Sequence, residues 1–176
     1  MKNASLKYLP WFLWLLLLII SCTPQPANPE VGPKESPHIG YLAPDFTLET
    51  DDGSSVTMSS LRGKSVFINF WDIACPYCRF EMPIIQRMHD TYSSQGLVVL
   101  SINIQNGKDD VIVYKDRMKL TFPVLLDADG KVSEAYLIQG KPQSYFVDKD
   151  GIIQNIYIGE LSTAKMEERV LQILGK

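Results

Sequence analysis

Two cysteines stand two residues apart in the stretch FWDIACPYCRFEMP, which runs from Phe70 to Pro83. The pair Cys75 and Cys78 could be a structural disulfide, two ligands of a metal ion, or a redox couple. A disulfide that closes so short a loop removes little entropy from the unfolded chain, so a purely stabilising role is a weak explanation. The pair needs a chemical explanation instead.

The position of the cysteines favours redox chemistry. Pro76 suits the first turn of a helix because it has no amide hydrogen to leave unsatisfied there. Cys75 would then lie at the helix N-terminus, where free amides and the helix dipole favour a negative charge. A free thiol with a pKa of about 8.5 is only about 3% ionised at pH 7. We therefore expect the Cys75 thiol to ionise more readily than a free one.

The elements around this pair predict an α/β fold. The apolar run 65–71 is typical of a buried strand, and the residues after the cysteines have a helical pattern to about residue 94. Further strands are expected at 97–104 and 122–127, with helices at 109–118, 131–137 and 162–174. Hairpins are expected around the turns DDGS and KDG. Strands that alternate with helices predict a sandwich with a mixed central β-sheet and helices on both faces, preceded by an N-terminal β-hairpin.

The N-terminal 39 residues do not resemble part of this fold. Residues 1–21 have a basic start and the apolar run WFLWLLLLII, typical of an export signal. The end of this run, from Ile19 to Cys22, resembles the lipobox of bacterial lipoproteins, in which the cysteine is lipidated. An uncleaved anchor and ordinary signal cleavage remain alternatives. Residues 22–39 are rich in proline and read as a tether, which leaves 40–176 as the folded domain.

The charge of the chain excludes one class of function. The formal charge is −3, and removal of Lys2 and Lys7 with the signal would leave 15 basic against 20 acidic residues. An acidic domain without a basic run is a poor nucleic-acid binder.

Lipidation of Cys22 would leave Cys75 and Cys78 as a closed pair.

The segment FINFWDIACPYCRFEMP resembles the active site of the thioredoxin superfamily. The opening GYLAPDFTLETDDGSSVTMSSLRGKSVFINFW and the later stretch FPVLLDADGKVSEAYLIQGKPQSYFVDKDGII are similar to exported, membrane-tethered TlpA/ResA-type thiol-disulfide oxidoreductases. The resemblance runs from about Gly40 to the C-terminus. It implies a thioredoxin-like sandwich and protein-disulfide exchange, with no cofactor besides a redox-active disulfide between Cys75 and Cys78.

The resemblance also implies a role for individual residues. Cys75 would be the attacking cysteine, Cys78 the resolving one, and Glu81 a partly buried acid that exchanges protons with the resolving thiol. Pro142 would follow a cis peptide bond, and the backbone of Lys141 would pair with substrate. A solvated surface role for Glu81 and an ordinary loop role for Pro142 are the alternatives. Trp71, Pro76 and Tyr77 complete the predicted substrate contacts, although core packing is a second interpretation of Trp71.

The same family suggests partners and a location. The substrates would be exported proteins with disulfides or thiols, including apocytochrome c during cytochrome c biogenesis. A membrane-bound thiol-disulfide donor would restore the reducing power. The domain would face the periplasm or another extracytoplasmic space, held to the membrane by the lipid on Cys22.

Departures from the family pattern leave the direction of electron flow open. Ala74 stands where the family usually has tryptophan, and the dipeptide Pro76-Tyr77 makes a CPYC motif that resembles glutaredoxins. A disulfide oxidant or isomerase that uses the same cysteines is therefore an alternative to a reductase.

Two further alternatives have weaker support. A peroxiredoxin shares the opening of the domain but needs a threonine three residues and a proline seven residues before its cysteine. Cys78 has Cys75 and Trp71 at those positions. In a copper- or zinc-binding lipoprotein the two thiolates could hold the ion, but the sequence offers only His38 and His89 as further ligands, and neither has a normal ligand spacing from Cys78. No metal site is expected.

Overall fold

The computed structural model describes residues 34–176. Its centre is a five-stranded sheet in the order β5-β4-β3-β6-β7. Strands β3, β4 and β5 are parallel, whereas β6 pairs antiparallel with β3 and β7 antiparallel with β6. The bounds are β3 (Ser65–Trp71), β4 (Leu97–Ile104), β5 (Val124–Asp127), β6 (Gln143–Val147) and β7 (Ile153–Ile158). This mixed sheet confirms the predicted fold class.

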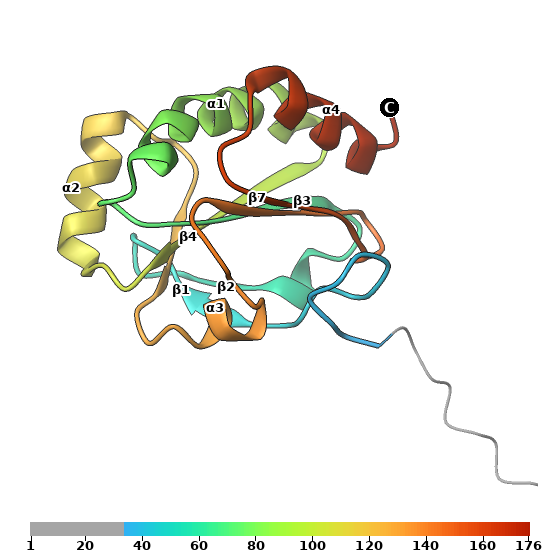
Figure 1. Cartoon of the computed structure of the whole chain (residues 1–176), viewed down its shortest axis with the longest axis horizontal. Helices are drawn as coiled ribbons and strands as arrows, with labels where there is room; N and C mark the ends of the chain where they lie inside the picture. Colours follow the sequence, from blue (N-terminus) through green and yellow to red (C-terminus); the bar gives the residue numbers. More distant parts are fainter. Residues whose placement is uncertain (1–33) are drawn as a thin grey trace, which may run out of the picture. The chain divides into compact units, whose positions relative to one another are not determined.

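Helices cover both faces of the sheet, and a β-hairpin precedes it (Figure 1). On one side lie α1 (Pro76–Tyr92), α2 (Lys108–Met118) and α4 (Thr163–Leu174). On the other lie α3 (Lys131–Ala135) and the hairpin of β1 (Thr47–Glu49) and β2 (Ser55–Thr57). Two short 3-10 helices, Met58–Leu61 and Ser93–Gln95, complete the described elements.

The central strand β3 is buried along its whole length, so its side chains alternate between two hydrophobic cores. Phe67 and Trp71 pack under α1, α2 and α4 with residues such as Met82 and Val170. Val66, Ile68 and Phe70 pack on the other face against the hairpin side and α3. This double burial explains why the segment is an almost continuous apolar run.

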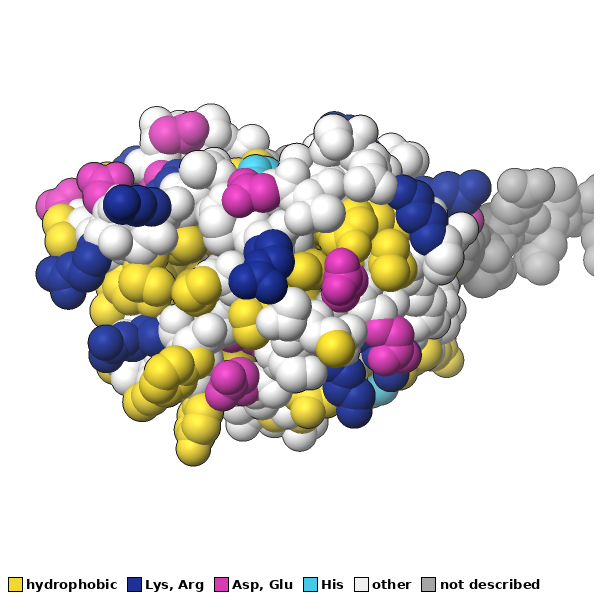
Figure 2. Space-filling view, turned by 90° about the horizontal axis from the view of Figure 1, so that it is seen from above, with side chains coloured by type: hydrophobic (Ala, Val, Ile, Leu, Met, Phe, Trp, Pro, Cys, Tyr) yellow, Lys and Arg dark blue, Asp and Glu magenta, His cyan; other side chains and the backbone are white. Residues whose placement is uncertain are grey.

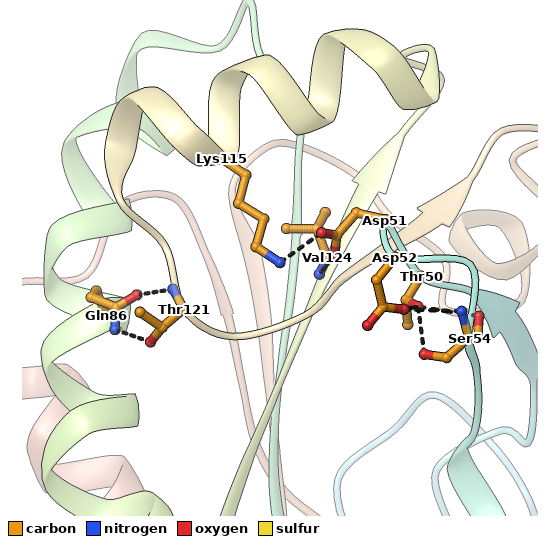
Figure 3. Close-up of polar contacts among 8 residues, drawn as sticks. All are labelled: Thr50, Asp51, Asp52, Ser54, Gln86, Lys115, Thr121 and Val124. Atoms are coloured by element: carbon orange, nitrogen blue, oxygen red, sulfur yellow. Dashed lines mark hydrogen bonds and ion pairs between the residues drawn. The ribbon is translucent and has the colours of Figure 1, made fainter.

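The hairpin turn is joined to the start of β5 and to α2 (Figure 3). Asp51 accepts a hydrogen bond of 2.7 Å from the Val124 backbone N–H and forms an ion pair of 2.6 Å with Lys115 of α2. In the loop just before β5, the Gln86 side chain of α1 bonds both the backbone and the hydroxyl of Thr121. These contacts hold α1 and α2 in fixed positions relative to the sheet.

The predicted signal segment and Cys22 lie outside the described residues. Residues 34–39, which the sequence analysis assigns to the tether, are hydrogen-bonded to the folded part. Ser36 N–H donates to the Leu42 carbonyl over 2.9 Å, and Glu35 accepts from the Asp45 N–H over 3.3 Å. Within residues 34–176, none of the helices has the length and apolar character needed to cross a membrane.

Candidate active site

The two cysteines meet at the N-terminus of α1, directly after β3. Cys75 is the N-cap residue and Pro76 occupies the first turn, as predicted. Cys75 and Cys78 form a disulfide with their Cα atoms 5.3 Å apart. The Cys78 backbone N–H also donates a 3.2 Å hydrogen bond to the Cys75 sulfur. A free amide at a helix N-terminus would stabilise a thiolate on Cys75 in the same way once the disulfide is reduced.

The two sulfurs differ in accessibility. Cys78 is completely buried, whereas Cys75 is partly exposed. Only Cys75 can therefore be reached by a large disulfide substrate, and Cys78 can attack only from within. This difference agrees with the predicted order of an attacking and a resolving cysteine.

A loop from the other half of the sheet faces Cys75. The peptide bond between Lys141 and Pro142 is cis, which confirms that structural expectation. The Lys141 carbonyl oxygen lies 3.4 Å from the Cys75 sulfur. Pro142 is buried at the start of β6, and Lys141 is exposed. The loop thus offers its backbone beside the sulfur that a substrate would reach.

Asp72 links this loop to the cysteines and was not singled out in the sequence analysis. Its carboxylate accepts a 2.8 Å hydrogen bond from the Cys75 backbone N–H and forms an ion pair with Lys141. One side chain therefore holds the two sides of the site together. Its position directly after β3 and just before the cysteine motif is the sequence feature that could have identified it.

Glu81 is fully buried one helical turn beyond Cys78, which rules out the solvated alternative. Its carboxylate accepts hydrogen bonds from the Leu161 backbone N–H, at 2.8 Å, and from the Asn69 side-chain amide, at 3.0 Å. Burial raises the pKa of Glu81 from 4.5 to about 7, although both hydrogen bonds act in the opposite direction. The penalty of desolvating a carboxylate therefore outweighs its two donors.

Asn69 is a second buried contributor that the sequence analysis did not identify. Its amide nitrogen donates to Glu81 and also, over 3.0 Å, to the Ser144 hydroxyl of β6. Asn69 and Ser144 are paired residues on neighbouring strands. A lone asparagine inside the apolar run SVFINFW was the signal, because a fully buried amide needs partners.

The predicted substrate contacts fall into two groups. Tyr77 is 61% exposed and its neighbour Phe80 is 68% exposed, so both present rings to solvent beside the disulfide. Pro76 is also exposed. Trp71 is completely buried with its ring 5.1 Å from that of Tyr114, so the assignment of Trp71 as a substrate contact is corrected to core packing.

The two histidines lie away from the cysteines. The His38 ring is hydrogen-bonded to Ser36, and His89 lies near the end of α1 with its ring against Phe122. Among residues 34–176, no three histidine, cysteine, aspartate or glutamate side chains gather in a way that could hold a metal ion.

A thioredoxin-like sheet with a disulfide at the N-terminus of the helix after its central strand defines a class, the thiol-disulfide oxidoreductases. Comparison with known proteins agrees with this class. The model of the AhpC/TSA family matches residues 39–156. The chain belongs to this thioredoxin-like family.

Two relatives show what the chain is similar to in sequence. The thiol-disulfide oxidoreductase ResA of Geobacillus kaustophilus is 33% identical over 135 residues, which cover 77% of this chain and 78% of the relative. The thioredoxin-like protein YneN of Bacillus subtilis is 33% identical over 144 residues, covering 80% and 81%.

Solved structures show the same similarity. A thiol:disulfide interchange protein from Chlorobium tepidum superposes with a TM-score of 0.71 at 28% identity, covering 76% of this chain and 96% of that one. StoA from Bacillus subtilis gives a TM-score of 0.64 at 26% identity, covering 72% and 96%. The thioredoxin-like fold and the oxidoreductase class are thus supported by sequence and structure alike.

Proposed function

We propose that this chain reduces disulfides of exported proteins through Cys75 and Cys78. The observation that supports this most directly is the asymmetric pair, a partly exposed sulfur beside the Lys141 carbonyl and a buried one behind it. The Cys75 thiolate attacks a substrate disulfide, a mixed disulfide forms, and one substrate sulfur leaves as a thiol. Cys78 then attacks Cys75, which releases the second substrate thiol and closes the Cys75–Cys78 disulfide.

Glu81 would serve the second step. Cys78 must lose a proton before it can attack, and its sulfur lies where water has no access. A carboxyl group with a pKa of about 7 exists in both protonation states near neutral pH. Such a group can accept the proton from Cys78 and return it in the next cycle. Asn69 would hold the carboxylate in place, and so acts as a positioning residue.

The proposal includes partners and a location. The substrates are proteins outside the cytoplasm, among them apocytochrome c, and a membrane-bound dithiol donor returns two electrons to the Cys75–Cys78 disulfide. The domain is held at the membrane by a lipid on Cys22 and a proline-rich tether. The support for this part is the lipobox-like end of the N-terminal apolar segment.

A trapping experiment tests the exchange mechanism. In a Cys78→Ala variant the mixed disulfide cannot be resolved, so a covalent adduct between Cys75 and a substrate should accumulate in cells. The adduct should disappear on reduction and in a Cys75→Ser, Cys78→Ala double variant. Absence of any Cys75-dependent adduct would refute the mechanism.

The standard potential of the disulfide tests the direction. A value near the thioredoxin potential of about −270 mV would support the reductive role, whereas a value near about −120 mV would make the protein an oxidant. Equilibration of the purified protein with glutathione buffers measures it. The oxidant is the second candidate because Cys75 is an N-cap, a position that stabilises the thiolate and hence the reduced form.

The anchor has its own test. A Cys22→Ala variant should be released from membranes if the lipid on Cys22 is the attachment, and the released protein should keep its exchange activity. Continued membrane attachment of this variant would indicate an uncleaved N-terminal anchor.

A further inference from the structure

A cavity of about 340 Å³ opens beside the reactive disulfide, on the side of Ala74. One wall is the loop residues Ile73 and Ala74, which directly precede Cys75. The opposite wall is α2. The complete lining is Ile73, Ala74, Asn106, Asp110, Val113, Tyr114 and Arg117. The cavity is large enough for a whole aromatic side chain, since binding pockets for small molecules start at about 300 Å³.

Both walls of this cavity are fixed by contacts outside it. The Asn106 side chain accepts a 3.1 Å hydrogen bond from the Ile73 backbone N–H, which joins the loop to the residues before α2. Lys115 ties α2 to the hairpin turn through Asp51 (Figure 3). Tyr114 packs against the buried Trp71. The cavity is therefore a property of the fold and needs no rearrangement to form.

The lining suits an aromatic group with its edge toward solvent. Ile73, Val113 and the Tyr114 ring are apolar, and Val113 is 58% exposed, which leaves a hydrophobic surface uncovered. Figure 2 shows hydrophobic side chains gathered toward the end of this face where α2 lies. Arg117 lies in the same lining and forms no ion pair within residues 34–176. A free guanidinium can stack on an aromatic ring, where a cation–π contact adds to burial.

Two smaller cavities also lie next to the disulfide. One of about 280 Å³ is lined by Pro76, Arg79, Phe80 and Met118, and one of about 230 Å³ lies around Gly140 and Lys141. Of these three cavities, two lined by a chain neighbour of Cys75 and one by Lys141, the cavity at Ala74 is the largest. It is therefore the best place for a bulky side chain.

We propose that this cavity binds an aromatic side chain of the substrate protein, at the position next to its reacting cysteine. The inference deepens the proposed exchange function and rests on it. In the mixed disulfide the substrate cysteine is bonded to the Cys75 sulfur, and its chain neighbours lie about 3.8 Å away along the backbone, measured between Cα atoms. Ala74 is the equivalent neighbour of Cys75. Because Ala74 lines the cavity, a side chain flanking the substrate cysteine lies within reach of it, and a bulky ring would bury the surface of Ile73 and Val113 there.

The test compares disulfide-linked peptide dimers of the forms Gly-X-Cys-Gly and Gly-Cys-X-Gly, where X is Trp, Tyr, Leu, Glu or Ala. The full chain is first reduced, and the second-order rate constant for reduction of each peptide is measured by acid quench and mass spectrometry. The Trp and Tyr peptides of one form should react about tenfold faster than the Ala peptide, as expected for filling a hydrophobic pocket. The Leu peptide should fall between them.

Two variants locate the preference. Ala74→Trp fills the cavity from its exposed wall, so the ratio of Trp to Ala peptide rates should fall close to one. Arg117→Gln removes the cation only, and should reduce the Trp to Leu ratio by about two- to fivefold. Asp116→Trp adds the same bulk to α2 at an exposed position outside the cavity, and should leave all ratios unchanged.

The outcomes separate this proposal from the exchange function. Equal rates for all X, or an aromatic preference that survives in Ala74→Trp, would overturn the cavity assignment while leaving exchange intact. Fastest reaction of the Glu peptides would show that Arg117 selects charge, which also contradicts the aromatic assignment. Failure of the reduced protein to react with any of the peptides would refute the exchange function itself.

Discussion

The clearest quantitative consequence of the structure concerns Glu81 and the change Glu81→Gln. The glutamine has nearly the same shape and can keep both buried contacts. Its carbonyl oxygen accepts from the Leu161 N–H as the carboxylate does. The amide group of the introduced glutamine then faces Asn69. The Asn69 side chain can rotate by 180°, so that its oxygen, which has no partner within the described protein, accepts from the glutamine amide and from the Ser144 hydroxyl. The substitution therefore removes the charge and keeps these contacts, but the rotated NH2 group of Asn69 then points to a place where the described protein offers no acceptor, a cost that does not depend on pH.

The magnitude follows from the two pKa values. Burial raises the pKa of Glu81 from 4.5 to about 7, so between these values the folded protein binds a proton that the unfolded chain has lost. The contribution of this group to stability is complete below pH 4.5 and is lost as the pH rises toward and through 7. A difference of about 2.5 units corresponds to about 3.4 kcal/mol over the whole range, and to about 2.5 kcal/mol between pH 5 and pH 8.

The assay is urea unfolding of both proteins at pH 5 and pH 8, with the Cys75–Cys78 disulfide intact so that neither active-site thiol titrates. The unfolding free energy of the wild type should fall between these pH values by about 2.5 kcal/mol more than that of Glu81→Gln. Other titrating groups cancel in this difference because both proteins share them. If the two proteins show the same pH dependence, the carboxyl has an ordinary pKa and the proposed proton exchange with Cys78 loses its basis.

Three further changes test single contacts. Asn69→Leu removes a donor that lowers the pKa of Glu81, so the pH at which stability declines should move upward in the same urea series. Asp72→Asn keeps the acceptor for the Cys75 N–H but removes the carboxylate charge beside it, leaving the Lys141 cation unpaired. Reduced Cys75 should then react faster with iodoacetamide at pH 6 than in the wild type, and a slower reaction would contradict this electrostatic reasoning. Tyr136→Phe removes the hydroxyl that donates a 2.8 Å hydrogen bond to the Pro44 carbonyl. Stability should fall by about 1–2 kcal/mol in urea unfolding at constant slope, and an unchanged midpoint would show that water replaces the contact.

Local patterns predicted the fold well because each had one structural explanation. The apolar run 65–71 could only be a strand buried on both faces, and Pro76 after Cys75 fixed the start of α1. The boundary near residue 39 was less predictable. Residues 34–39 have a tether-like composition, yet their backbone bonds reach Leu42 and the Glu35 side chain bonds the Asp45 N–H, and the proline content does not reveal such pairing.

The site was predictable where its residues are close in sequence. Cys75, Cys78 and Glu81 follow one another at three-residue intervals, and the resemblance to the thioredoxin superfamily implied their roles. Asn69, Ser144 and Leu161 come from β3, β6 and the segment before α4, and only the strand order brings them to Glu81. The burial of Trp71 likewise depends on α2 covering that face of the sheet, which the sequence around the cysteines does not record.

The hydrogen bond from Leu161 to Glu81 couples two parts of the molecule that are far apart in sequence. Because the donated N–H belongs to the segment before α4, any protein that docks there and draws Leu161 away removes a donor from the buried acid and raises its pKa. Linkage makes the effect reciprocal, so the charge on Glu81 also sets how firmly that segment is held. Slow exchange of the Leu161 amide with deuterated solvent would then report the protonation of the acid.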